Sequence, residues 1–94
     1  MSDASEPCRI DVWLWRARFF KTRGLAAKFV EAERIRLIRA GQGEVRLDKA
    51  SRTVRPGDRL VFAIGGRLFD LSIVDAGARR GPAAEARALY TLES

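Results

Sequence analysis

The chain has 94 residues, and its 18 Lys or Arg residues against 12 Asp or Glu residues give a formal net charge of +6 at pH 7. This length predicts one domain, with a core that needs neither a metal nor a disulfide. Cys8 is the one cysteine, so no internal disulfide can form, which favours a reducing compartment. No apolar run approaches the ~18–20 residues that span a bilayer, and residues 1–8 lack the apolar centre of a signal peptide. We therefore expect a cytoplasmic protein with no membrane partner.

The positive charge is concentrated in one segment. Residues 9–39 hold nine bases and three acids, a net charge of +6, whereas residues 40–94 hold nine bases and seven acids, a net charge of +2. Residues 1–8 hold two acids and no base. A local excess of cations indicates a polyanionic partner, although solubility alone is the alternative explanation.

The N-terminal third predicts two helices after a disordered tail at residues 1–8. In the segment 9–20, five apolar residues recur at the spacing of one helix face. They are Ile10, Trp13, Leu14, Ala17 and Phe20. Thr22 then offers an N-cap for a second helix. Its expected buried stripe consists of Leu25, Ala26, Phe29 and Val30. We expect this helix to end near Ala32, because Glu33 falls on the same stripe and a charge is costly to bury.

The rest of the chain predicts strands and one short helix. Segments 34–39 and 44–47 alternate as half-buried strands do, with a turn between them. Arg55-Pro56-Gly57-Asp58 is a β-turn pattern, and Gly65-Gly66 is a hairpin connection between two further strands at 60–64 and 68–74. Gly81-Pro82 begins a helix over residues 82–90.

The predicted fold class is therefore α+β. Two packed N-terminal helices lie on a small, mainly antiparallel sheet, followed by a short C-terminal helix, in a single domain at residues 9–94.

The usual chemistry of a catalytic site is missing from the sequence. The chain has no histidine, so the commonest general base is absent, and nothing is positioned to activate Cys8. No cluster of side chains has the spacing of a metal site, and no glycine motif for a nucleotide cofactor is present. We expect a protein that is not an enzyme and that needs no metal or cofactor.

The segment Lys21-Thr22-Arg23 suggests a phosphate contact. It combines two cations with the start of a predicted helix, where free backbone N–H groups and the helix dipole favour an anion. Capping alone is the alternative role for Thr22. Lys28 lies on the exposed side of the second predicted helix and would extend the basic surface.

The first predicted helix has a second apolar side, formed by Val12, Trp15 and Phe19, with Arg16 beside them. One interpretation is that the C-terminal helix covers it through Ala84, Leu89 or Tyr90. The alternatives are an aromatic and basic surface for RNA, a docking face for a protein partner at Trp15 and Phe19, or a helix that lies on a membrane surface.

Three segments carry a resemblance to a known family. RIDVWLWRARFFKTRGLAAKFVEAERI, residues 9–35, resembles the helical core of the S4 RNA-binding domain. In particular, it resembles the R-[IL]-D-x-W-L-W-x-x-R-x-x-K-T-R run of small heat-shock-induced, ribosome-associated proteins, the heat shock protein 15-like subgroup. TVRPGDRL, residues 53–60, resembles the PGD turn of that domain, and RRGPAAEARALY, residues 79–90, resembles the C-terminal helix of the subgroup.

The resemblance implies an S4-like helix pair, the alpha-L motif. The basic surface of this helix pair is expected to contact structured RNA. The implied partners are ribosomal RNA or ribosome-bound tRNA on the large ribosomal subunit, and we expect a monomer. Arg9, Arg18, Lys21, Thr22 and Arg23 fall on motif positions of the family. With Arg16 and Lys28, which the charge pattern adds, the candidate RNA-binding residues are Arg9, Arg16, Arg18, Lys21, Thr22, Arg23 and Lys28. The chain departs from the subgroup at Val12, where a Lys is usual, and in the greater length of residues 35–48.

Overall fold

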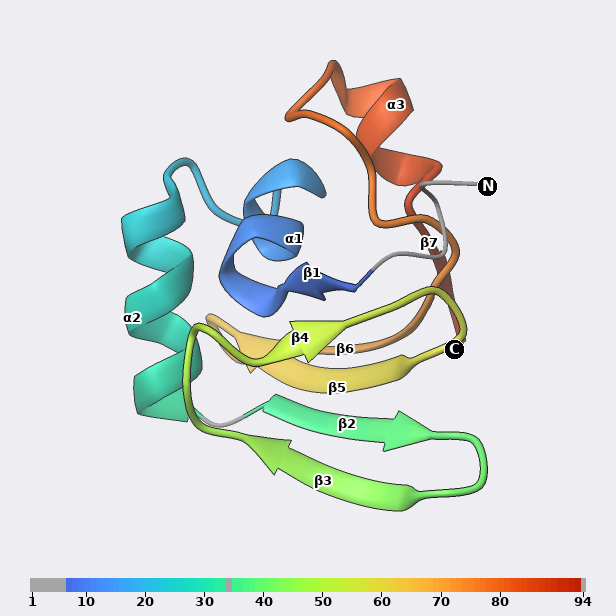
Figure 1. Cartoon of the computed structure of the whole chain (residues 1–94). Coiled ribbons are helices and arrows are strands. Elements are labelled where there is room, and N and C mark those ends of the chain that lie inside the picture. Colours follow the sequence, from blue (N-terminus) through green and yellow to red (C-terminus); the bar gives the residue numbers. More distant parts are fainter. Residues whose placement is uncertain (1–6, 34, 94) are drawn as a thin grey trace.

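The computed structural model describes residues 7–33 and 35–93, and within these ranges it contains three helices and two antiparallel sheets (Figure 1). The helices are α1 (Ile10–Arg16), α2 (Arg23–Glu33) and α3 (Ala83–Arg87). The larger sheet consists of β2 (Ile35–Arg39), β3 (Gly43–Leu47), β5 (Arg59–Ile64), β6 (Arg67–Ile73) and β7 (Tyr90–Leu92), and the smaller of β1 (Cys8–Arg9) and β4 (Thr53–Val54). The predicted α+β class is confirmed. None of the helices in the described ranges is long and apolar enough to cross a membrane.

The five-stranded sheet has the order β3-β2-β5-β6-β7, and every neighbouring pair is antiparallel. Two hairpins, β2–β3 and β5–β6, form most of it, as the alternating segments predict. Gly65 and Gly66 join the second hairpin with φ angles of 57° and 83°, the left-handed pair that a two-residue type I′ turn requires. In Figure 1, α1 and α2 lie together on one side of the sheet, and α3 lies near β7.

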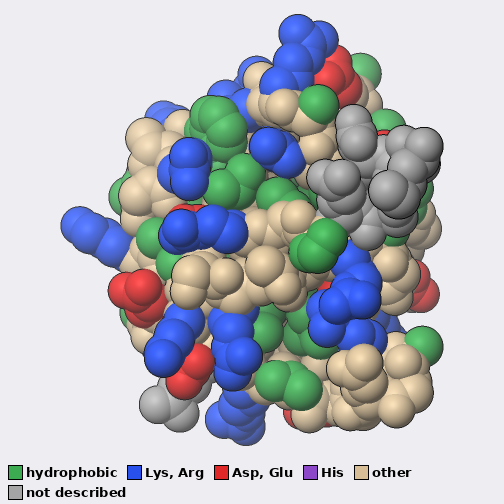
Figure 2. Space-filling view, in the orientation of Figure 1, with side chains coloured by type: hydrophobic (Ala, Val, Ile, Leu, Met, Phe, Trp, Pro, Cys, Tyr) green, Lys and Arg blue, Asp and Glu red, His purple; other side chains and the backbone are tan. Residues whose placement is uncertain are grey.

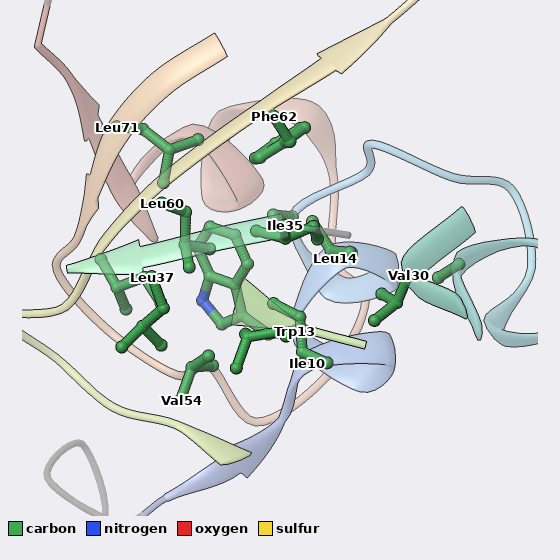
Figure 3. Packing of buried hydrophobic residues seen from close by; sticks show 14 of the residues in the cluster. Ile10, Trp13, Leu14, Val30, Ile35, Leu37, Val54, Leu60, Phe62 and Leu71 are labelled. Carbon is green, nitrogen blue, oxygen red and sulfur yellow. The ribbon is translucent and has the colours of Figure 1, made fainter. Parts of the chain in front are cut away.

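Trp13 lies at the centre of the hydrophobic core (Figure 3). Its side chain is 0% exposed, and its indole N–H donates a hydrogen bond to the Asp75 carbonyl oxygen at 3.0 Å. Ile10 and Leu14 from the same helix face and Leu60 from β5 are also 0% exposed. The buried stripe of α1 is therefore confirmed at these positions, and it packs directly on the sheet.

The helix α1 ends four residues earlier than the apolar spacing predicts. Arg18 has a φ of 66°, the left-handed conformation that usually ends a helix on glycine. The Arg18 N–H bonds the Trp15 carbonyl at 3.1 Å, and the Phe19 N–H bonds the Leu14 carbonyl at 3.0 Å. These two bonds form a Schellman motif in which arginine occupies the glycine position. Phe20 therefore lies in the α1–α2 connection rather than in the helix.

Phe19 leaves the helix and enters a cluster of aromatic rings. Its ring centroid lies 5.4 Å from that of Phe62, 5.2 Å from that of Phe69 and 5.2 Å from that of Tyr90. The contact between Phe19 and Tyr90 supports one of the alternatives for the second apolar side of α1, in which the C-terminal segment covers it. Trp15 and Phe19 are both half-buried, so the alternative of a fully open face at these two residues does not match the structure.

The start of α2 follows the sequence prediction. The Thr22 hydroxyl accepts a hydrogen bond from the Leu25 N–H at 3.1 Å, which is the contact that an N-cap makes with the third residue of a helix. Ala26 and Val30 are buried as expected, but Leu25 is 49% exposed, so the buried stripe of α2 is narrower than predicted. The helix extends to Glu33, one residue beyond the predicted end near Ala32. Glu33 is exposed, so its charge is not buried and the helix can include it.

The turn at Arg55–Asp58 has an ion pair inside it. Gly57 has a φ of 95°, as a type II turn requires, and the Asp58 N–H bonds the Arg55 carbonyl at 3.1 Å. The Asp58 carboxylate, buried to 1% exposure, accepts two hydrogen bonds from Arg39 at 2.8 and 2.6 Å and one from the Arg55 N–H at 2.9 Å. This carboxylate therefore joins the end of β2 to the turn before β5.

Three expectations on the segment boundaries need correction. Cys8 does not belong to a disordered tail, because it pairs with Val54 in the small sheet. The rest of the predicted tail, residues 1–6, lies outside the described residues, as does Arg34 at the start of the predicted 34–39 strand. The C-terminal helix spans Ala83–Arg87 rather than residues 82–90. Tyr90 instead begins β7, which pairs with the end of β6 at Ile73.

Candidate RNA-contacting surface

The α1–α2 connection presents its cations to solvent. Lys21, Thr22 and Arg23 are all exposed, and Arg23 is the first residue of α2. The first turn of α2 contains no acidic residue, so the positive end of the helix dipole has no local counter-charge. Lys28 is exposed one turn further along the helix. The structure therefore brings Lys21, Thr22 and Arg23 together at the start of α2, whereas Lys28, five positions after Arg23, lies about 140° round the helix from it.

Two arginines join this connection to the segment before α3. Arg18 donates from Nε to the Gly81 carbonyl at 2.6 Å, and Arg80 donates from Nε to the Trp15 carbonyl at 3.1 Å and from Nη2 to the Phe20 carbonyl at 3.5 Å. We call this reciprocal pair the Arg18–Arg80 bridge. It holds the end of α1 in place, and it positions the exposed residues that follow. The sequence analysis missed Arg80; the one signal for it is its place in the segment 79–90 that resembles the family.

Arg9 and Arg16 have other contacts. Arg9 forms a two-point ion pair with the buried Asp11, at 3.0 and 2.9 Å. Arg16 donates to the Gly77 carbonyl at 2.8 Å and the Ala76 carbonyl at 3.4 Å, so it holds the loop after β6 against α1. Its buried Nε has no hydrogen-bond partner among the described residues. Both arginines line a groove of about 450 Å³ with Cys8, and neither lines the smaller pocket that Arg18 borders.

The cations of the α1–α2 connection take no part in the ion pairs found among the described residues. Five arginines pair with acids within the described residues: Arg9 with Asp11, Arg36 with Glu44, Arg39 with Asp58, Arg59 with Asp70, and Arg79 with Glu85. In the same part of the chain, Arg18, Lys21, Arg23 and Lys28 form no ion pair. Figure 2 shows that Lys and Arg side chains are more prominent than acidic ones on the face that carries α1 and α2. These cations are therefore available to an external anion.

Cys8 is not a reactive thiol in this environment. Burial raises its pKa, and the positive charge of Arg16 only partly opposes this effect. The thiolate is the nucleophilic form, so alkylation of Cys8 by iodoacetamide at pH 7 should be slower in the folded protein than in an unfolded control. The rate is measured with and without urea; equal rates would contradict the assignment. No group of three or more metal-ligating side chains occurs in the described ranges.

Comparisons with known proteins agree with the resemblance seen in the sequence. No family model matches the chain. It is 31% identical over 87 residues to the heat shock protein 15 homolog of Haemophilus influenzae, covering 93% of this chain and 62% of the relative. It is 34% identical over 82 residues to heat shock protein 15 of Escherichia coli, covering 87% of this chain and 57% of the relative. The chain thus spans about 60% of the length of the curated relatives it matches.

A solved structure shows the same fold. The structure of Vibrio cholerae heat shock protein 15 superposes with a TM-score of 0.79 at 34% sequence identity, covering 95% of this chain and 84% of that chain. That protein is a trimer, in contrast to the monomer expected here from the sequence. Because the chain is 34% identical to this solved relative and covers 84% of it, the chain belongs to the heat shock protein 15 family.

Proposed function

We propose that this protein is a non-catalytic, ribosome-associated RNA-binding protein. Its partner is structured RNA, either ribosomal RNA or ribosome-bound tRNA on the large ribosomal subunit. The contacting residues are Arg18, Lys21, Thr22, Arg23 and Lys28. The observation that carries the proposal is the group of exposed cations at the start of α2, which has no acid in the first helical turn and no ion pair among the described residues. The S4-like sequence of the helix pair supports RNA as the anion.

The geometry suits a phosphate group. The α2 N-terminus offers free N–H groups and a positive dipole end, and Arg23 offers a planar fork of donors beside the point charge of Lys21. Arg9 and Arg16 have supporting roles in this proposal, since their guanidinium groups already contact Asp11 and the loop after β6. If the surface neutralises about four to six phosphates, the logarithm of the affinity should fall with the logarithm of salt with a slope of roughly −3 to −5.

Reversing two charges at this site tests the proposal. The Lys21→Glu/Arg23→Glu variant should bind a structured ribosomal RNA fragment at least about tenfold more weakly, and its salt slope should be flatter by roughly 1–2. The variant should remain folded, because exposed charge changes usually alter the free energy of unfolding by within about 0.5 kcal/mol. Affinity is measured by titration at several salt concentrations, and folding by circular dichroism.

The matched control is Arg46→Glu/Lys49→Glu, which makes the same charge change on exposed residues of β3 and the loop after it. In Figure 1, β3 is the edge strand furthest from the α1–α2 connection. We expect this control to lose much less RNA affinity than the test variant. Equal losses would mean that only the total charge matters, and normal binding by the folded test variant would refute the assignment of Lys21 and Arg23.

A further inference from the structure

A small pocket lies between the α1–α2 connection and α3, next to the proposed RNA surface. Its volume is about 190 Å³, below the ~300–1,000 Å³ of pockets for drug-sized ligands, but enough for a single planar ring system. Three of its lining residues are alanines, Ala17, Ala83 and Ala86, which leave the space open because their side chains are short.

The other lining residues are aromatic rings and arginines. Phe19 and Tyr90 contribute rings at a centroid separation of 5.2 Å and an interplanar angle of 41°. Both rings are half-buried, and the surrounding aromatic cluster fixes that of Phe19. Arg18 and Arg87 are exposed and line the same pocket, and no acidic residue does. A ring surface next to two cations that form no ion pair among the described residues is complementary to a base attached to a phosphate.

The backbone of Arg18 provides an independent observation. It is the one non-glycine residue with a positive φ in the described part of the chain, at the C-terminal position of α1 where glycine is common. Non-glycine residues in this conformation are strained, and such strain occurs preferentially at functional sites. The Arg18 Nε donates to the Gly81 carbonyl from one side of the guanidinium, and its Nη groups donate no hydrogen bond to any described residue.

We propose that this pocket binds one unpaired nucleotide of the RNA, with the base against Phe19 and Tyr90 and the phosphate held by Arg18 and Arg87. This inference rests on the proposed function and extends it, because the phosphate contacts at Lys21 and Arg23 need no unpaired base. It gives the protein a preference for RNA with a bulge or a loop over a continuous duplex.

Two neighbouring positions on α3 give a matched test. Ala83 and Ala84 are both exposed, but only Ala83 lines the pocket, so Ala83→Leu fills it and Ala84→Leu does not. The probes are an RNA hairpin with a single unpaired 2-aminopurine in its stem and the same hairpin without that nucleotide. We expect Ala83→Leu to weaken binding of the bulged hairpin about tenfold and to abolish the fluorescence change of 2-aminopurine on binding. Ala84→Leu should preserve both.

A second variant tests the pocket even if Ala83→Leu does not fold. Arg87→Ala removes a cation of the pocket that is not among the contacting residues of the proposed function. Arg87 is exposed and forms no ion pair among the described residues, so the melting temperature should not fall, while the affinity for the bulged hairpin should fall. The pocket assignment is overturned if the wild type binds both hairpins equally, or if Ala83→Leu and Arg87→Ala are folded and bind the bulged hairpin normally. The proposed function survives these outcomes; it fails if the wild type binds neither hairpin.

Discussion

Replacing Trp13 with alanine should lower the free energy of unfolding by about 3–5 kcal/mol. The side chain is fully buried, and it contacts the core from the helix side as shown in Figure 3. The substitution removes this packing, leaves a cavity, and deprives the Asp75 carbonyl of the indole donor at 3.0 Å. A domain of this size is typically stable by about 5–15 kcal/mol, so the loss is a large fraction of the total stability. Urea unfolding followed by circular dichroism measures the change.

Trp15→Ala is the control for this prediction. It makes the same substitution in the same helix, but Trp15 is only half-buried, and its carbonyl rather than its ring contacts Arg80. We expect it to cost less than half as much as Trp13→Ala. A larger loss for Trp15→Ala would mean that the core is not centred on Trp13.

Replacing Asp58 with alanine should lower the free energy of unfolding by about 3 kcal/mol. The carboxylate is buried, and its removal leaves Arg39 and the Arg55 N–H without their acceptor. The side chain of Arg39 is 20% exposed, so water can replace part of the lost contact, which places the effect at the lower end for a broken buried ion pair. The same urea titration measures it.

Asp70→Ala is the matched control. Asp70 makes the same two-point contact with an arginine, Arg59, at 2.8 and 2.6 Å, but on the exposed side of the sheet. The hydrogen bond from Arg59 lowers the pKa of Asp70, so the pair is ionised at pH 7 and its small stabilisation is lost as the pH falls below about 4. An exposed pair typically contributes about 0–1 kcal/mol. If the two variants lose equal stability, burial does not determine the strength of the Asp58 contact.

The parts of the fold that were predictable from the sequence are those with a regular local pattern. Ile10, Trp13 and Leu14 repeat with the period of a helix, and they are the buried face of α1. The diglycine at residues 65–66 and the Pro-Gly pair at residues 56–57 each require a special backbone conformation, and both form the expected turns. These features depend on residues close in sequence, so one chain is enough to reveal them.

The remaining elements depend on partners distant in the sequence. The strands β1, β4 and β7 have two or three residues, too few to show an alternating period, and each forms only through its pairing with another strand. The end of α1 was missed because its left-handed residue is Arg18, and arginine carries no signal for that conformation. Likewise, Arg80 bonds backbone carbonyls, which every residue possesses, so no pattern marks them as its partners.

The candidate site also contains residues that a local sequence pattern predicts and residues whose contacts only the structure shows. Lys21, Thr22 and Arg23 were predicted together from a local pattern, and the structure brings them to one helix start with Thr22 as its cap. Their contact with RNA remains a prediction. Arg9 and Arg16 carried equal weight in the sequence, and only the folded arrangement shows that they contact Asp11 and Gly77.

The Arg18–Arg80 bridge has a consequence for the growing chain during translation. Six side-chain bonds to the backbone, from Trp13, Arg16, Arg18 and Arg80, join the region of α1 and the α1–α2 connection to residues 75–81. They span 62, 60, 61, 63, 65 and 60 residues. Synthesis proceeds from the N-terminus at about 5–20 residues per second, so α1 and α2 exist for several seconds before Gly81 and Arg80 are added. During that interval the α1–α2 connection lacks the bonds that fix its shape. The α1–α2 connection therefore acquires the shape seen in this structure only after most of the chain has been synthesised.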